Sequence, residues 1–451
     1  MTRMYLTIII AVFIALGPAG SMGVLRDPAL IFLATVIITA LAPVPGVVLS
    51  LSIKPEHLSD AFARRRVLRR LRIAGIAYQV YLLVSFAFIF YLVDWPWFVD
   101  VSLHLGRWVL VDDLLRLLPF VTMLVLSWMP LYRIDRIVRR GMWSMREYIA
   151  FHFRQYVLFI LAPFILIVTA ADAFVLLPGS QTLVDRGFRI PLAVAGMIVL
   201  YVFLPVLLRI IWKTRHMADG PLRARLAALC DRAGMKYSDI LVWETMGGHI
   251  ANACVTGITA LARYVMVTDG LMDALTPEEI EAVFAHEIGH IKRHHMGYYA
   301  LFAAAFLVLL TLAPWETSPP PESASLLAEL LSAETVTVLA LLVLYWGVGF
   351  GFLSRRMELE ADLYATELVG STEVFVTALE RISLQSGRPR NASGWRHFSI
   401  AKRTQFLLDC ASDPKKRARF QTGMSIMRWT IIALAAGLGV ALALTVAGVG
   451  V

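Results

Sequence analysis

Residues 276–295, TPEEIEAVFAHEIGHIKRHH, place two histidines four positions apart, with a glutamate directly after the first. On a helix, His286 and His290 lie on one face, and their imidazoles can bind one metal ion. Glu287 then lies beside them, where its carboxylate can polarise a water molecule bound to that metal. These residue types at this spacing indicate metal-assisted hydrolysis.

The start of this segment carries the signals of a helix N-terminus. Thr276 is a good N-cap, Pro277 suits the first helical position, and Glu279 completes a capping box. Ile280 begins an apolar face with helical spacing. An amphipathic helix with two surface histidines would show the same local pattern, so a third ligand is needed to indicate a metal site.

A second polar segment, residues 354–370 (SRRMELEADLYATELVG), offers carboxylates with helical spacing. A catalytic zinc takes three protein ligands and keeps one position open for water. Glu358 and Asp362 are four residues apart, so one can bind the metal while the other accepts the N–H of a metal-binding histidine and fixes its tautomer. Spacing alone does not separate Glu358 from Glu360 as the ligand, and a solvated acidic helix face would show the same pattern.

The elements that must position these residues are mostly apolar. The chain has 451 residues, 58% of them hydrophobic and 17% charged, and its mean hydropathy is +0.69. This composition is typical of a membrane protein. About nine stretches are apolar enough to cross a bilayer as helices of roughly 20 residues. They cover approximately residues 5–25, 29–53, 73–93, 114–132, 157–177, 191–212, 298–313, 335–353 and 427–451.

The charges of the loops predict the orientation of these spans. Residues 54–72 and 133–154 are rich in arginine, whereas the loop after the third span is acidic and the loop after the seventh has neither Lys nor Arg. Because basic loops are retained in the cytoplasm, the alternation places the N-terminus inside and the C-terminus outside. The net charge of +9 has the same origin, so no nucleic-acid partner is expected.

Two further histidines, His294 and His295, follow one turn beyond the motif. A fourth protein ligand would block the water position that hydrolysis needs. We therefore interpret both as helix-end histidines that interact with the helix dipole or with the membrane surface.

The predicted fold is mainly α-helical and polytopic, with a split polar domain at the cytoplasmic face. Its two polar parts are separated by two spans, yet both lie inside and can fold together against the membrane. The predicted segments are an N-terminal membrane domain of about six spans (1–212), the part with the zinc helix (213–296), two spans (297–353), the part with the third ligand (354–426) and a final span (427–451).

The order of these motifs resembles the integral-membrane metallopeptidases of the family that includes the CAAX prenyl protease and the bacterial heat-shock membrane protease. H-E-x-x-H on a helix is followed by two spans and then by an S-R-x-x-E-x-x-x-A-D-like stretch. The resemblance covers roughly residues 215–425, and the six preceding spans match no motif. It implies a gluzincin-type zincin domain with a small β-sheet, with Glu358 as the third zinc ligand and Asp362 as the partner of a metal-binding histidine.

Two flanking segments extend the resemblance. Asn252 precedes residues 263–275, a region similar to the edge strand before the family's zinc helix, and the resemblance implies that Asn252 helps to hold an extended substrate there. Downstream, the stretch from His397 to Arg403 resembles the family's H-P-x-x-x-x-R segment, although Phe398 replaces the proline. His397 would donate to the oxyanion formed in hydrolysis, and Arg403 would position substrate or brace the site. A turn asparagine, a surface histidine and a cytoplasmic arginine are the alternatives.

These observations predict a zinc-dependent membrane endopeptidase with one Zn²⁺ per chain. We expect it in the bacterial inner membrane as a multi-pass protein whose active site faces the cytoplasm, with membrane-associated or misfolded proteins as substrates. A CAAX-type processing protease is an alternative, as is a membrane scaffold or transporter that retains a structural metal site. Glu287 disfavours the scaffold, because a structural metal needs no general base. Zinc is implied by resemblance, since other divalent metals also accept two imidazoles and a carboxylate.

Overall fold

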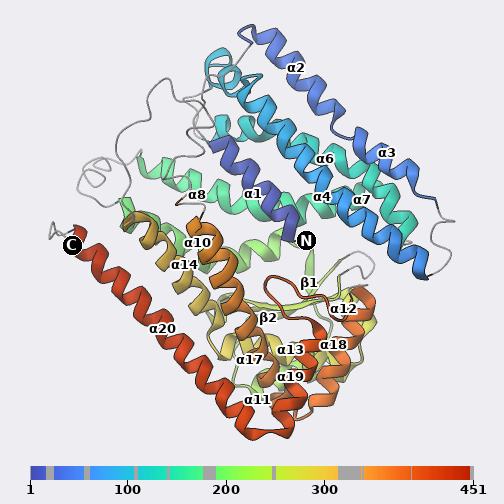
Figure 1. The fold of residues 1–451 in the computed structure, drawn as a ribbon, viewed down its shortest axis with the longest axis vertical. Coiled ribbons are helices and arrows are strands. Elements are labelled where there is room, and N and C mark those ends of the chain that lie inside the picture. The colour runs from blue at the N-terminus through green and yellow to red at the C-terminus, as the bar shows by residue number, and fades with distance from the viewer. Residues whose placement is uncertain are drawn as a thin grey trace. The chain divides into compact units, whose positions relative to one another are not determined.

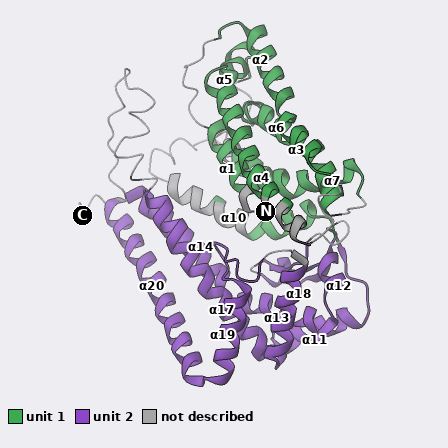
Figure 2. Ribbon diagram, turned by 45° about the vertical axis from the view of Figure 1, so that its right-hand side comes forward, with its two compact units in different colours: residues 1–214, 244–247 green, residues 215–243, 248–451 purple. Residues whose placement is uncertain are grey.

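The computed structural model describes most of the 451 residues. The described residues are 2–16, 25–54, 61–105, 110–139, 143–175, 189–245, 250–257, 259–312, 337, 340–386 and 389–446. They divide into two compact units, coloured separately in Figure 2: unit 1 comprises residues 1–214 and 244–247, and unit 2 comprises residues 215–243 and 248–451. The first continuous stretch of unit 1 ends at Thr214, and the division at residues 212/213 stays a prediction from the sequence.

Unit 1 is helical. Large aromatic side chains from its two longest helices are fully buried, including Phe86, Phe90, Phe120 and Trp128. Other apolar side chains on the long helices point outward, as expected of helices that face lipid. The helices are α1 (Thr2–Leu16), α2 (Pro28–Leu41), α3 (Val44–Ser52), α4 (Ala61–Tyr91), α5 (Trp95–Trp97), η2 (Phe98–Ser102), α6 (Val111–Arg139), α7 (Met145–His152), η3 (Phe153–Leu158), α8 (Phe159–Val175) and α10 (Arg189–Ile211).

Unit 2 combines a small sheet with helices (Figure 1). Its buried apolar core joins the sheet to the helices that carry both predicted motifs. The elements are β1 (Thr214–His216), α11 (Pro221–Arg232), β2 (Asp239–Trp243), β3 (Ala253–Thr256), η4 (Ala260–Ala262), β4 (Tyr264–Thr268), α12 (Asp269–Ala274), α13 (Pro277–Lys292), α14 (His295–Leu312), η5 (Leu342–Phe350), α17 (Gly351–Val369), α18 (Thr372–Ser386), α19 (Ile400–Ser412) and α20 (Pro414–Val446).

Six helical segments among the described residues are long and apolar enough to cross a membrane: Pro28–Ser52, Arg70–Tyr91, Val111–Val138, Met145–Thr169, His295–Leu312 and Pro414–Thr445. They overlap six of the predicted spans, although Met145–Thr169 and Pro414–Thr445 begin 12 and 13 residues before the predicted starts at 157 and 427. The first and sixth predicted spans overlap shorter apolar helices, Met4–Ala15 and Val202–Ile211. The eighth, 335–353, lies partly outside the described residues. The second span is divided between α2 and α3, because Pro43 has no N–H with which to continue the helix.

The sheet has four strands in the order β1-β2-β4-β3. β2 and β4 are parallel, with Asp239 opposite Tyr264, and both are buried along their whole length, as is usual for parallel strands. β3 is antiparallel to β4, with Ala253 opposite Val267, and it forms an edge of the sheet. The small sheet confirms the predicted fold class of a mainly helical polytopic chain with a small β-containing domain.

Helix α13 begins where its sequence predicts. Thr276 is the N-cap, and the capping box is complete, since the Thr276 backbone N–H donates to Glu279 Oε2 over 2.9 Å. Farther along, α13 packs closely on α17 at Gly289. A Cβ added at Gly289 would lie 3.1 Å from the Ala361 Cα and 3.2 Å from the Tyr364 Cβ. The absence of a side chain at Gly289 therefore sets the close approach of the two motif-bearing helices.

We expect Gly289→Ala to destabilise the protein, because the added methyl must push α17 away from α13. Overpacking of this kind costs about 1–3 kcal/mol, which outweighs the gain of about 1 kcal/mol that alanine brings in a helix. Gly297→Ala is the matched control, because nothing lies within 4 Å of a Cβ added at that helical glycine. Thermal unfolding of the purified variants in detergent measures the effect. Equal melting temperatures for the two variants would contradict the packing argument.

Candidate metal centre

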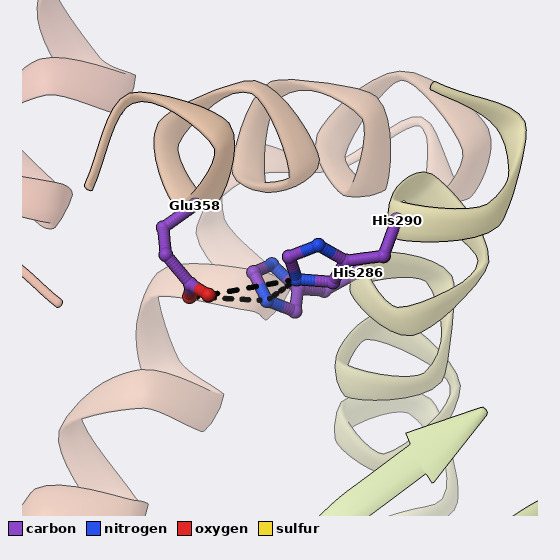
Figure 3. Close-up of side chains that lie close together, drawn as sticks. All are labelled: His286, His290 and Glu358. Atoms are coloured by element: carbon purple, nitrogen blue, oxygen red, sulfur yellow. Dashed lines mark hydrogen bonds and ion pairs between the residues drawn. The ribbon is translucent and has the colours of Figure 1, made fainter. Parts of the chain in front are cut away.

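Three side chains from α13 and α17 converge in unit 2 (Figure 3). The Nε2 atoms of His286 and His290 lie 3.2 Å apart. Glu358 places its carboxylate oxygens 3.6 Å from His286 Nε2 and 3.7 Å from His290 Nε2. These are the atoms that could bind a metal ion, and one donor atom from each residue lies within 4.8 Å of the others.

The spacing of these donors fits a zinc-sized ion. A tetrahedral ion with bonds of about 2.0–2.1 Å holds its ligand atoms roughly 3.3 Å apart, close to the observed separations. His286 and Glu358 are also nearly fully buried, at 7% and 3% exposure. Two imidazole nitrogens and one carboxylate that face one another are a donor set typical of a catalytic zinc site. The donor set therefore fits a divalent cation.

Packing also separates the two glutamates that spacing left open. Glu358 lies with the two histidines, whereas Glu360 turns to the other side of α17 and contacts His295. Burial raises the pKa of Glu358, but hydrogen bonds from His286 and His397 outweigh it and hold that pKa well below its ordinary value. The carboxylate is therefore ionised and ready to bind a cation.

Asp362 holds the far side of the His286 ring. Its Oδ1 lies 2.8 Å from His286 Nδ1, and its side chain is completely buried. Arg403, on α19, pairs with both carboxylate oxygens, with Nε 2.8 Å from Oδ2 and a terminal nitrogen 2.5 Å from Oδ1. Burial raises the pKa of Asp362, but the Arg403 charge and the His286 hydrogen bond lower it further than burial raises it. With Nδ1 directed at Asp362, Nε2 is the ring nitrogen of His286 that faces His290 and Glu358.

Glu287 lies between the donors and the sheet. Burial raises its pKa to about 7, an effect partly opposed by His286 and by a backbone hydrogen bond from Val255 on the edge strand β3. A carboxylate whose pKa lies near neutrality can both take up and release a proton. That property suits a general base beside a metal site.

The other predicted residues lie at different distances from this centre. His397 is half exposed, and its Nδ1 lies 2.8 Å from Glu358 Oε2, so it borders the donor set. Asn252 is exposed at the start of β3, and its backbone is held by Thr268, whose hydroxyl lies 2.9 Å from both the Asn252 N and O. Arg403 contacts Asp362 and is mostly buried, a placement that suits bracing better than contact with substrate.

The interpretation of His295 as a helix-end histidine that interacts with the helix dipole or with the membrane surface is wrong. His295 is completely buried, with Nδ1 2.8 Å from His290 Nδ1 and Nε2 2.9 Å from Glu360. The reason is that the chain turns sharply at His294, whose φ is +57°, so that His295 starts α14 and folds back against α13. In the sequence, the only indication of this contact was Glu360, a second acidic residue two positions after Glu358. The spacing of residues within one helix gave no reason to pair Glu360 with a histidine of another helix.

Comparisons with known proteins agree with this geometry. Residues 217–424 match the family profile described as "Peptidase family M48". The chain is 28% identical over 188 residues to "Protease HtpX" of Pseudomonas paraeruginosa, which covers 39% of this chain and 60% of that protein. It is 29% identical over 230 residues to "Protease HtpX homolog" of Aeropyrum pernix, which covers 47% of this chain and 67% of the relative. The chain thus spans less than two thirds of the length of the Pseudomonas relatives that it matches.

The similarity of fold to a solved structure extends beyond the segment that the family profile matches. The crystal structure of S. mikatae Ste24p superimposes with a TM-score of 0.54 over 82% of this chain and 98% of that chain, at 18% sequence identity. At this identity the likeness concerns the fold alone. All the residues brought together at the candidate metal centre lie between residues 217 and 424, where the family profile matches. Residues 217–424 therefore resemble peptidase family M48, in agreement with the resemblance that the motifs of this segment show.

Proposed function

We propose that this chain is a zinc-dependent endopeptidase of the membrane, which hydrolyses peptide bonds of membrane-associated or misfolded proteins. The observation that carries the proposal is the convergence of His286, His290 and Glu358 with Glu287 directly beside them. A structural metal site needs no general base beside its ligands. A carboxylate whose pKa is raised to about 7 adds the proton-transfer group that hydrolysis needs.

His286, His290 and Glu358 would hold the zinc ion. When bound, zinc supplies Lewis acidity that makes a water molecule more acidic and polarises the scissile carbonyl. Glu287 takes the proton of the attacking water and later delivers it to the leaving amine. His397 lies at the edge of the donors and can donate a hydrogen bond to the carbonyl oxygen as its negative charge grows. Asp362 and Arg403 keep His286 in the tautomer that presents Nε2.

The substrate backbone has a place to bind at β3. This strand forms an edge of the sheet and lies next to α13, and Val255 within it contributes a backbone hydrogen bond to Glu287. An extended peptide that adds to such an edge gains main-chain hydrogen bonds with little dependence on its side chains. Asn252, exposed at the beginning of β3, would hold one end of the bound segment. This mode of binding suits an enzyme that acts on many unfolded sequences.

The cell location follows from loop charge. The arginine-rich loops support a location of the peptidase segments on the cytoplasmic side of a bacterial inner membrane. Membrane lipid and protein substrates are then its expected partners. A CAAX-type processing enzyme would share the same chemistry and differ only in substrate choice.

The test uses the full chain purified in detergent with an unfolded polypeptide as substrate. We expect cleavage by the wild-type chain, loss of cleavage after treatment with a chelator, and recovery after stoichiometric zinc is added. Digests of a prenylated and an unprenylated peptide of equal sequence separate the two substrate classes. Equal cleavage supports the general endopeptidase, and cleavage of the prenylated peptide alone would replace it by the processing enzyme. Cleavage that persists unchanged in the chelated protein would contradict the metal-dependent mechanism.

A further inference from the structure

A second chain of buried polar groups leads away from the candidate metal centre. His290 Nδ1, the ring nitrogen that faces away from Glu358, lies 2.8 Å from His295 Nδ1. The other nitrogen of His295 lies 2.9 Å from Glu360 Oε2. One terminal nitrogen of Arg428, on α20, lies 2.5 Å from both oxygens of Glu360. Four side chains from four helices are therefore connected in one line.

Because these side chains are buried, each polar group among them would destabilise the fold if it had no hydrogen-bond or ion-pair partner. His295 is completely buried, and the side chain of Glu360 is 8% exposed. A buried carboxylate without a partner would be strongly destabilising, and here Arg428 and His295 contact Glu360, with Arg293 Nε 4.0 Å from its Oε1. A guanidinium nitrogen of Arg428 donates to both carboxylate oxygens of Glu360, and His295 Nε2 lies against one of them, so neither oxygen carries a proton. Glu360 is therefore ionised and can only accept hydrogen bonds.

The direction of every hydrogen bond follows from that acceptor. Because Glu360 cannot donate, His295 carries its proton on Nε2 and donates it to Glu360. The Nδ1 of His295 then has a lone pair and accepts a hydrogen bond from His290 Nδ1. His290 thus carries its proton on Nδ1 and has its lone pair on Nε2, the atom 3.2 Å from His286 Nε2. One ionised carboxylate at the end of the line fixes which nitrogen of His290 is free to bind a metal.

We propose that His295 and Glu360 are positioning residues for the metal ligand His290, with Arg428 holding Glu360 in place. The inference rests on the metal centre of the proposed function. It gives His290 the same support that Asp362 and Arg403 give His286, through one additional histidine. Because Arg428 lies on α20, a helix apolar enough to span a membrane, the line joins the C-terminal span to the metal centre.

The test compares two glutamates of α17 that both pair with α20. Glu360 pairs with Arg428 and with His295, whereas Glu367 pairs with Arg417 and has no histidine partner among its described ion pairs. Glu360→Gln and the control Glu367→Gln each remove one charge from the same pair of helices. We measure the affinity for Co²⁺ of the full chain in detergent by competition with a chelator, and record the ligand-field spectrum and the thermal unfolding of the metal-free protein.

We expect Glu360→Gln to weaken Co²⁺ binding by about 10–100-fold, the usual cost of losing a partner of a metal-binding histidine, and to change the spectrum. Glu367→Gln should bind Co²⁺ as the wild type does. Equal affinities and spectra for all three proteins would overturn the positioning role. A wild-type chain that binds no Co²⁺ would instead overturn the metal centre itself, so the two failures are distinct.

A second measurement covers the case in which Glu360→Gln does not fold. Nitrogen-15 NMR of histidine-labelled, zinc-loaded wild-type protein reports the tautomer of each ring directly. We expect His295 to carry its proton on Nε2 and His290 to carry its proton on Nδ1. A His295 ring protonated on Nδ1 would overturn the assigned line of hydrogen bonds, because it could then accept nothing from His290.

Discussion

Glu287→Gln is expected to retain metal binding and to lose nearly all peptide hydrolysis. The glutamine amide has the shape of the carboxylate but cannot accept a proton, so the attacking water keeps both of its hydrogens. General acid–base groups contribute about 10²–10⁴-fold to rate, and we expect a loss at the upper end of this range because Glu287 would act twice, as base and as acid. Metal content measured by elemental analysis should remain one ion per chain.

The control for this variant is Glu278→Gln, on the first turn of the same helix α13. Glu278 is half exposed and pairs with Arg225, and it lies more than two turns before His286. The Glu278→Gln variant should cleave the unfolded substrate as the wild type does. Wild-type turnover in Glu287→Gln would exclude the general-base role and with it the proposed mechanism. The inactive variant should also retain bound substrates, which can be identified after purification from the native membrane.

Glu358→Gln is expected to lose tight metal binding. The substitution keeps the shape of the side chain but removes the negative charge that faces two imidazoles. Loss of a group that only supports a ligand costs about 10–100-fold in metal affinity, so loss of the ligand itself should cost more than about 100-fold. Competition with a chelator measures the affinity, and activity should fall with the fraction of metal bound.

Comparison with Glu360→Gln tests which of the two glutamates binds the metal. Both glutamates lie on α17, two residues apart, and both are buried. The structure places Glu358 with the histidine Nε2 atoms and Glu360 behind His295. The loss of affinity should therefore be larger for Glu358→Gln than for Glu360→Gln. The reverse order would exchange the roles of the two carboxylates.

Local patterns predicted the elements of this site well. The capping residues and apolar spacing of residues 276–295 predicted helix α13, and hydropathy predicted most of the spans. Both are properties of neighbouring residues: a cap satisfies N–H groups of its own first turn, and a span needs only enough consecutive apolar residues. The four-residue separation of His286 and His290 likewise follows from the pitch of a single helix.

Residue spacing alone left three features open, and all three depend on contacts between segments far apart in the chain. Glu358 and Glu360 differ in role because of the way α17 packs against α13, at a distance set by Gly289. His295 is buried because the turn at His294 folds α14 back towards the metal centre. Arg403 and Arg428 pair with Asp362 and Glu360 across 41 and 68 residues.

The candidate metal-binding motif was thus determined by the sequence itself, because helix periodicity alone places its two histidines on one face. Its third ligand was marked out in the sequence only through family resemblance. The hydrogen-bond partners of each histidine were decided by the tertiary structure. A hydrogen bond needs two groups within about 3 Å of each other, whatever their separation in the chain. At the candidate centre, the two carboxylates that contact His286 and His295 are each paired with an arginine distant in the chain.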